Sequence, residues 1–251
     1  PVVNDVYVSG TGWRTILVGG LGAGGRGYYA LDITDPNNPA ALWEFSNDAL
    51  GGSNNLGLTF GNPVVTKRTN GTWVVAFTSG YNNVSPGNGN GRLFVVNAMT
   101  GQLLSQVPTL ISAGVPAGTT TTPSGLAKIN AWVDSPLDNT AKRFYGGDLL
   151  GNVWRFDIDG QVQPNNAALR LAELRTGLTA PQPITTRPEL SEVKQGAVKH
   201  AVVYVATGKL LGLGDISSTS QQTIYAIKDP LTNTPQGDVR SNSNMVVQTL
   251  T

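Results

Sequence analysis

A unit of short strands recurs along this chain, and it limits the possible folds more than any other feature. Short apolar runs, rich in β-branched and aromatic residues, are each bounded by Gly, Pro, Asn, Asp or Ser, as expected for strands separated by turns. In each unit a strand ending in glycine leads through a loop to a strand that closes with a polar residue, and then to a further strand. Four such units occupy residues 10–45, 56–106, 126–176 and 183–230.

Antiparallel units that repeat roughly every 60 residues predict the blades of a β-propeller. One twisted four-stranded sheet cannot bury both of its faces, whereas radial stacking lets each blade cover its neighbour. We therefore predict an all-β chain in which residues 1–251 form a single propeller domain or part of a ring. Residues 165–176 read equally well as a strand or a helix, because their leucine spacing matches neither period well.

Acidic residues recur near the ends of strands, where they suit turns better than catalysis. Asp32 and Asp157 occupy equivalent places in their units, and Asn97 and Lys228 stand there in the other two. An Asp side chain accepts backbone N–H bonds from residues further along a turn, which explains its repetition. Asp148 precedes a predicted hairpin and has the same interpretation.

Glycine and tryptophan are expected where blades meet. Glycines at strand ends suit a crowded centre where backbones converge: Gly19, Gly20, Gly80, Gly146, Gly147 and Gly208. Most of the five tryptophans are expected in the core, with Trp43 docking one blade on the next: Trp13, Trp43, Trp73, Trp132 and Trp154.

Composition excludes several classes of function. The net charge is +1, so no basic surface large enough for nucleic acid is expected. The chain has no cysteine, which rules out thiol nucleophiles, disulfides and cysteine-ligated metals. Its single histidine, His200, has no nucleophile motif to serve and reads as a partly exposed strand residue. No apolar run reaches the 18 or so residues of a transmembrane helix.

Three glycine-rich or polar loops remain as candidate sites. Residues 20–27 resemble a dinucleotide fingerprint, but a strand rather than a helix is predicted to follow them, so a β-connection is favoured. Residues 81–91 and 112–125 are long polar loops of the kind that carry recognition on rigid scaffolds. The alternative is that these two loops have no binding function.

Six segments together resemble the C-terminal propeller of the PilC/PilY family, the tip-associated adhesins and assembly factors of bacterial type IV pili. The resemblance follows the chain in order and covers nearly all of it; the segments are GGLGAGGRGYYALDITDPNNPAALWEF, LGLTFGNPVVTKRTNGTWVVAFTSGYNN, GRLFVVNAMTGQLL, YGGDLLGNVWRFDI, PITTRPEL and VVYVATGKLL. It implies a quinoprotein-like propeller that is exported and reaches the cell surface or pilus tip, the periplasm or the outer membrane of a Gram-negative bacterium.

The same resemblance implies a calcium loop, which is degenerate here. Asp134 and Asp138 match the first and fifth loop positions, but Pro136 stands at the third and Lys142 at the ninth. Calcium takes six to eight oxygen ligands, and an ammonium group at a ligand position would repel it. A metal-free turn in which Lys142 pairs with an aspartate is favoured over a site completed by Asn139 and backbone carbonyls.

The resemblance therefore implies a non-enzymatic protein that supports pilus extension, surface adhesion and twitching motility through protein contacts. Its expected partners are minor pilins or other pilus components, and a host or abiotic surface ligand. No cofactor is expected apart from possible calcium at Asp134 and Asp138. The alternative is a dehydrogenase propeller with pyrroloquinoline quinone, which would need a calcium with carboxylate ligands and a catalytic aspartate.

Overall fold

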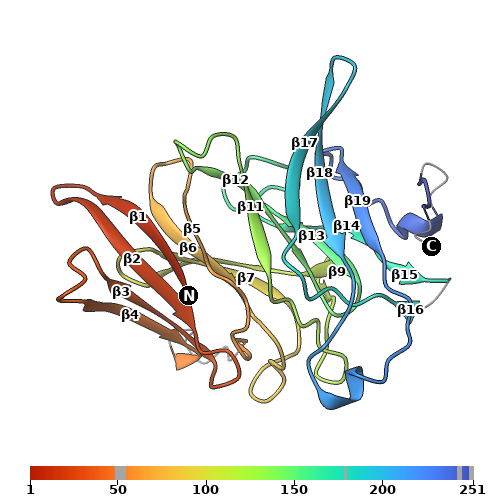
Figure 1. The fold of residues 1–251 in the computed structure, drawn as a ribbon, viewed down its shortest axis with the longest axis horizontal. Helices are drawn as coiled ribbons and strands as arrows, with labels where there is room; N and C mark the ends of the chain where they lie inside the picture. Colours follow the sequence, from red (N-terminus) through yellow and green to blue (C-terminus); the bar gives the residue numbers. More distant parts are fainter. Residues whose placement is uncertain (49–54, 178–179, 242–244, 249–251) are drawn as a thin grey trace.

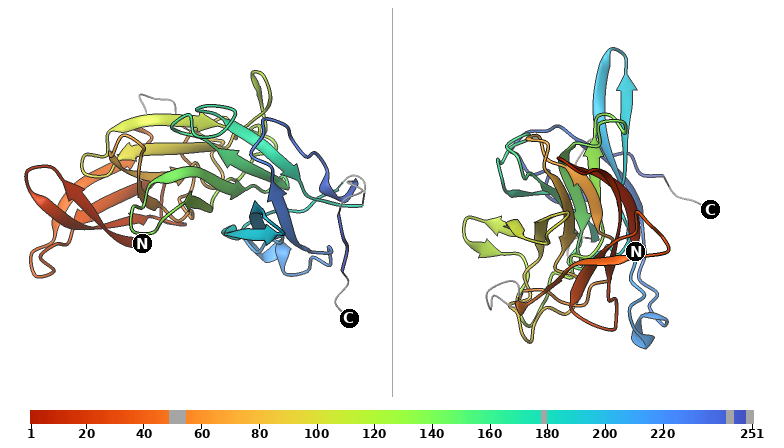
Figure 2. Two further views of the ribbon diagram at one scale, coloured as in Figure 1. Left: turned by 90° about the horizontal axis from the view of Figure 1, so that it is seen from above. Right: turned by 90° about the vertical axis from the view of Figure 1, so that its left-hand side faces the viewer.

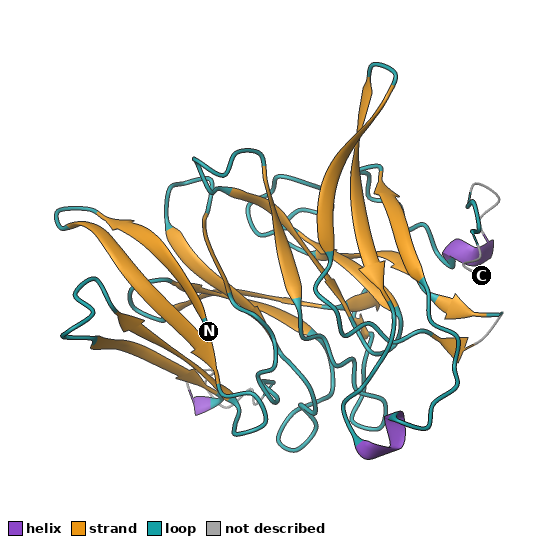
Figure 3. Cartoon of the chain, in the orientation of Figure 1, coloured by secondary structure: helices purple, strands orange, loops and turns teal. Residues whose placement is uncertain are grey.

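The computed structural model describes residues 1–48, 55–177, 180–241 and 245–248, and this part of the chain is built from strands. Helix in this part is limited to short 3₁₀ turns, which include η2 (Leu213–Asp215) and η3 (Val239–Ser241) (Figure 3). None of the described helices is long and apolar enough to cross a bilayer. The prediction of an all-β chain is confirmed.

Four antiparallel sheets follow one another along the chain, each with its strands in sequence order. The first sheet contains β1 (Val2–Val8), β2 (Gly12–Gly20), β3 (Gly27–Asp32) and β4 (Ala40–Ser46). The second contains β5 (Val64–Lys67), β6 (Trp73–Thr78), β7 (Arg92–Asn97) and β8 (Leu103–Pro108). The third contains β11 (Ile129–Val133), β12 (Ala141–Gly147), β13 (Asn152–Phe156) and β14 (Ala168–Glu173).

The fourth sheet has three strands, β17 (Glu189–Gln195), β18 (Val198–Ala206) and β19 (Ile224–Asp229). Two small hairpins lie in the connections: β9 (Leu110–Ser112) with β10 (Val115–Pro116), and β15 (Arg175–Thr176) with β16 (Ala180–Pro181). Residues 165–176 thus include β14, and their ambiguity resolves to strand. The first sheet also begins before the first sequence repeat, because β1 pairs with β2 over its whole length.

The sheets stand side by side in an arc (Figures 1 and 2). β1 contacts β5, β5 contacts β11 and β11 contacts β17, so the first strands of successive sheets lie next to one another. Each sheet covers its neighbour, and three apolar clusters fill the spaces between them. The third sheet is buried on both faces, since every residue of β13 is buried. This is the radial stacking expected of propeller blades.

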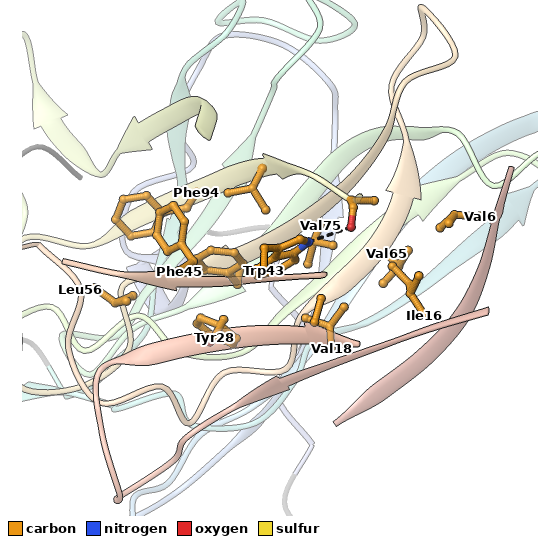
Figure 4. Close-up of a cluster of buried hydrophobic side chains, with 14 residues drawn as sticks. Val6, Ile16, Val18, Tyr28, Trp43, Phe45, Leu56, Val65, Val75 and Phe94 are labelled. Atoms are coloured by element: carbon orange, nitrogen blue, oxygen red, sulfur yellow. Dashed lines mark hydrogen bonds between the residues drawn. The ribbon is translucent and has the colours of Figure 1, made fainter. Parts of the chain in front are cut away.

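Aromatic rings fill the space between the first and second sheets (Figure 4). Tyr28 stacks on Phe77 with ring centroids 4.2 Å apart, and Phe45 meets Phe77 edge-on at 5.1 Å. Trp43 on β4 donates its indole N–H to the carbonyl of Ala98, the residue that follows β7 of the second sheet, 2.8 Å away. The prediction that Trp43 docks one blade on the next is confirmed.

Trp13 departs from the expectation that the tryptophans lie mostly in the core. It is 63% exposed, beside the turn that joins β1 and β2, and packs edge-on against Tyr7 and Trp73. Trp154, by contrast, is fully buried. Trp13 lies at one end of the first sheet, where no described strand covers one side of its ring. Its exposure follows from this position.

Close packing explains the expected glycines at most of their positions. A Cβ at Gly147 would lie 2.2 Å from Ile184, and one at Gly80 would lie 2.1 Å from the carbonyl oxygen of Leu58. Gly208 differs, because the nearest atom to its Cβ position is 3.9 Å away. The expectation of a crowded site is therefore wrong for Gly208, where the left-handed φ of 138° instead favours glycine.

Candidate functional site

Repeated turns account for the recurring acids. Asp32 accepts the N–H of Thr34, and Asp157 accepts backbone N–H groups from residues 160–162 and 166. In the last sheet the equivalent residue is Asp229, which accepts the N–H of Leu231 at 2.8 Å. The internal repeat predicts Lys228 at this place, which is one position too early. The sequence alone does not show whether Lys228 or Asp229 holds the turn; the hydrogen bonds of the structure do.

Asp148 is a buried carboxylate in the turn between β12 and β13. It accepts the backbone N–H groups of Leu150 and Asn152, as predicted, and also the indole N–H of Trp154 at 2.8 Å. Removal from water raises the pKa of Asp148 to about 6, even though these hydrogen bonds favour the charged form. Its contacts are those of a structural group that holds the hairpin.

The turn proposed as a degenerate calcium loop docks on the second sheet. The carbonyl of Asn139 accepts bonds from the Lys67 N–H at 2.9 Å and the Thr66 hydroxyl at 2.7 Å. Asp138 pairs with the ammonium of Lys67 at 2.8 Å, not with Lys142 as expected. Lys67 also lowers the pKa of the Asp138 carboxyl, mainly through this hydrogen bond. Contacts between blades therefore hold the turn.

The turn offers two carboxylates, Asp134 and Asp138, as candidate calcium ligands. Asp134 is exposed and accepts the indole N–H of Trp132 at 3.2 Å, while Asp138 is already neutralised by Lys67. Among the described residues no group of three or more Asp, Glu or His side chains could hold a metal ion. Two carboxylates, one of them paired with a cation, fall short of the six to eight oxygens that calcium takes.

The two long loops predicted as candidates for recognition lie against each other. Buried Asn83 donates to the carbonyls of Asn55 and Asn90, and the Asn90 side chain accepts from the Thr109 hydroxyl at 3.0 Å. The N–H of Ser124 donates to the carbonyl of Gly89, which joins residues 81–91 to residues 112–125. These bonds make one ordered surface of two loops that the sequence presents as separate.

The glycine loop at 20–27 adjoins the same surface. The guanidinium of Arg26 donates to the carbonyls of Asn82 and Pro86, at 3.0 and 2.8 Å. The strand β3, not a helix, follows the loop, as predicted. A dinucleotide site needs a helix N-terminus at this point, so the loop is a β-connection.

A chain of buried polar groups joins the third and fourth sheets. Arg155 on β13 forms an ion pair with Asp229 on β19, and their side chains are 1% and 0% exposed. The Tyr145 hydroxyl donates to the second oxygen of Asp229 at 2.6 Å and accepts from Arg143 at 2.6 Å. Arg143 in turn lies 4.2 Å from the ring centroid of Trp132. The network thus runs from the buried Arg155–Asp229 pair to the half-buried indole ring of Trp132.

Next to Trp132 lies a groove of about 600 Å³, bordered by residues of β11, β17 and β18. It is lined by residues 130–134, residues 190–192 and Lys199. The side-chain amide of Asn130, one of the lining residues, donates to the Pro188 carbonyl and accepts from Arg187. His200 lies nearby on β18, half-buried, in the role expected for it. Neither the groove nor the network is predicted from the sequence, because each joins residues that lie far apart along the chain.

The family model of the PilY1 β-propeller domain matches residues 1–250.

The chain belongs to the PilY1 β-propeller family.

Curated relatives and a solved structure agree with this assignment. The chain is 32% identical to a type IV pilus biogenesis factor PilY1 homologue of Xylella fastidiosa, over 92% of this chain and 17% of the relative. It is 33% identical to the type IV pilus biogenesis factor PilY1 of Pseudomonas aeruginosa, over 92% of this chain and 20% of the relative. The crystal structure of the P. aeruginosa PilY1 C-terminal domain superposes with a TM-score of 0.76 and 30% identity.

The match covers 94% of this chain and 50% of the solved PilY1 domain. The chain therefore spans about half of that domain and about a fifth of the curated relatives. The resemblance to the PilC/PilY family and the β-propeller fold are confirmed. The quinoprotein-like subtype of propeller stays a prediction.

Proposed function

We propose that this PilY1-family chain acts in type IV pilus assembly, as a non-enzymatic module that works through protein contacts. The observation that carries the proposal is the match of residues 1–250 to the family, together with relatives named as pilus biogenesis factors. The expected partners are minor pilins or other pilus components, and the expected site of action is the cell envelope or the pilus tip. Surface adhesion and twitching motility follow from such a role.

The ordered loop surface suits this function. Residues 20–27, 81–91 and 112–125 are held together by Arg26 and by the bond from Ser124 to Gly89. Loops fixed before binding lose less conformational entropy on association, which favours specific contacts. We propose that these loops form a surface that binds a pilus component.

A genetic experiment tests the role in assembly. Residues 1–251 are deleted in frame from the encoding gene, and surface pili are measured by shearing together with twitching zones. We expect pili and twitching to be lost and to return with the intact gene. Unchanged piliation and twitching after this deletion would refute the proposed function.

We propose that the turn at 134–142 needs no calcium, because the ammonium group of Lys67 supplies the positive charge beside Asp138. Calorimetric titration of the chelator-stripped protein with calcium should show no heat of binding, and calcium should not raise the melting temperature. A ligand that binds the folded state must raise that temperature. A micromolar calcium signal with a raised melting temperature would contradict this part of the proposal.

The dehydrogenase alternative has no support among these relatives, which are named for pilus biogenesis. Visible absorption after addition of pyrroloquinoline quinone and calcium separates the two readings. We expect only the spectrum of the free quinone. A shifted, saturable band would instead point to a bound cofactor.

A further inference from the structure

We propose that the β17–β18 hairpin joins two copies of this chain, by antiparallel pairing of β17 with β17 of the second copy about a two-fold axis at Val193. This pairing is independent of the pilus role, since it depends only on the hairpin. Three features of the hairpin lead to it: unbonded backbone groups on β17, an order of charges that complements itself when reversed, and open space beside the strand.

Alternate backbone groups of β17 point away from β18. The N–H of Thr207 donates to the carbonyl of Thr223 in continuation of the β18–β19 ladder, so odd-numbered residues of β18 bond to β19 and even-numbered residues bond to β17. The register places even residues of β18 opposite odd residues of β17, as His200 lies opposite Val193. The outward N–H and C=O groups of β17 therefore belong to the even-numbered residues: Leu190, Glu192 and Lys194.

These outward groups remain available for a further strand. Among the described residues their one contact is the hydroxyl of Ser191, 3.5 Å from the carbonyl of Glu192. That distance is at the limit of a hydrogen bond, and a carbonyl oxygen has a second lone pair. The edge of β11 differs, because the side chains of Asn62 and Asn130 already bond its outward groups. The edge of β17 is thus a template for strand addition.

The order of charges along β17 selects one register. Outward groups must meet, so even residues pair with even residues across a two-fold axis. With the axis at Val193, Glu192 and Lys194 of one copy lie opposite Lys194 and Glu192 of the other. An axis at Glu192 or Lys194 would place identical charges opposite each other, and an axis at Ser191 would place Lys194 opposite Pro188, which has no N–H. Charges that oppose most pairings therefore favour this one.

Lys194 gains an acidic neighbour in this register. Within its own hairpin it lies opposite Lys199, and no carboxylate of the described residues lies within 4.0 Å of its ammonium group. Glu192 already bonds Lys199 at 2.8 Å. A carboxylate has about four acceptor sites, and an exposed ion pair is weak, so Glu192 can bond a second ammonium group as well. Each Glu192 then lies between two lysines, one from each copy.

Val193 adds an apolar contact at the axis. Its side chain is 36% exposed in the single copy. In an antiparallel pair, opposite residues that share no hydrogen bonds come closest, with their Cα atoms about 4.5 Å apart. The two valines would therefore contact each other and remove apolar surface from water.

The hairpin leaves space for the second copy. It projects beyond the other sheets (Figures 1 and 2), and its tip consists of the small residues Gly196 and Ala197. Beside the base of β17 lies the groove of about 600 Å³, lined on this side by residues 190–192. In the proposed register Gly196 of the second copy lies opposite Leu190, so a small tip enters the groove.

Sedimentation velocity of the intact chain across the micromolar range tests the proposal. We expect a reversible equilibrium between monomer and dimer. Lys194→Glu places like charges opposite each other and should weaken association at least about tenfold. The same change gives Lys199 an acidic neighbour within the hairpin, so a lost dimer would not reflect a destabilised hairpin. A chain that stays monomeric, or a dimer that Lys194→Glu leaves unchanged, would overturn the proposal.

The double variant Glu192→Lys with Lys194→Glu is the matched control. It keeps the net charge and restores opposite charges in the same register, so its association should return to within about threefold of the parent. A double variant that associates as weakly as Lys194→Glu would refute this register.

Hydrogen–deuterium exchange separates strand pairing from a looser contact. The N–H groups of Glu192 and Lys194 should exchange slowly at high protein concentration and quickly at low concentration. The N–H of Val193, which bonds to β18, should exchange slowly at both. Fast exchange of Glu192 and Lys194 in the dimer would refute the strand pairing and leave the pilus role untouched.

Discussion

Two interfaces between neighbouring sheets use different chemistry. Between the first and second sheets the contact is aromatic, with Tyr28, Phe45 and Phe77 stacked or edge-on within 5.1 Å. Between the third and fourth sheets apolar side chains surround an ion pair of Arg155 and Asp229. Both interfaces bury their surfaces, but only the second depends on buried charges.

The difference teaches what each interface can specify. Apolar contact has no direction, so rings of similar volume satisfy it in several arrangements. A buried carboxylate between Arg155 and Tyr145 is stable only when both donors meet its oxygens. We infer that the aromatic interface mainly stabilises the propeller, whereas the polar interface also sets the register of the fourth sheet on the third. Substitutions in the two places should therefore behave differently.

The largest effect is expected from Asp229→Asn. The substitution keeps the shape but leaves the Arg155 cation buried without its counter-charge, which costs about 3–5 kcal/mol of the free energy of unfolding. Urea denaturation measures this loss. The double variant Arg155→Met with Asp229→Leu removes both charges and should recover most of the stability. If Asp229→Asn were as stable as the parent, the polar interface would not depend on its buried charges, and the contrast with the aromatic interface would be wrong.

The second effect concerns pH and Asp148. Its pKa is raised by burial to about 6 in the folded state, above the 3.8 of the unfolded state, so the folded protein binds its proton more tightly. This carboxyl therefore favours folding below pH 4, and that contribution falls as the pH rises through 6, by roughly 3 kcal/mol. Unfolding of the parent and of Asp148→Asn should be compared at pH 4 and pH 7. The stability of the parent relative to the variant should be greater at pH 4; a difference independent of pH would refute the shift.

A smaller effect is expected from Phe77→Leu in the aromatic interface. The two side chains have similar apolar character, and the neighbouring rings can repack, so the cost should stay below about 1.5 kcal/mol. The same urea experiment measures it. A loss as large as that of Asp229→Asn would show that the aromatic interface is no more tolerant than the polar one.

The smallest effect is expected from Asp138→Asn. The pair with Lys67 joins the second and third sheets at the surface, where water and salt screen it. We expect a melting temperature indistinguishable from that of the parent at 0.15 M salt. A clear drop would mean that this surface contact stabilises the blades as much as a buried one.

Local pattern was enough to predict the strands and several contacts. The four repeats led to four sheets, and the turn roles of Asp148 and Asp157 were confirmed because a turn depends on neighbours in sequence. Trp43 was also placed correctly. Trp13 was not, because its exposure depends on whether another strand covers the end of the first sheet.

The sequence by itself therefore determined the all-β class, the order of the blades and the polar turns, because strand propensity, alternation and turn chemistry act over a few residues. Tertiary structure alone decided which distant polar groups meet. Arg155 and Asp229 are 74 positions apart, and Lys67 reaches Asp138 across 71. Such pairs form only after apolar packing has brought the sheets together, so neither residue bears a local mark of its partner.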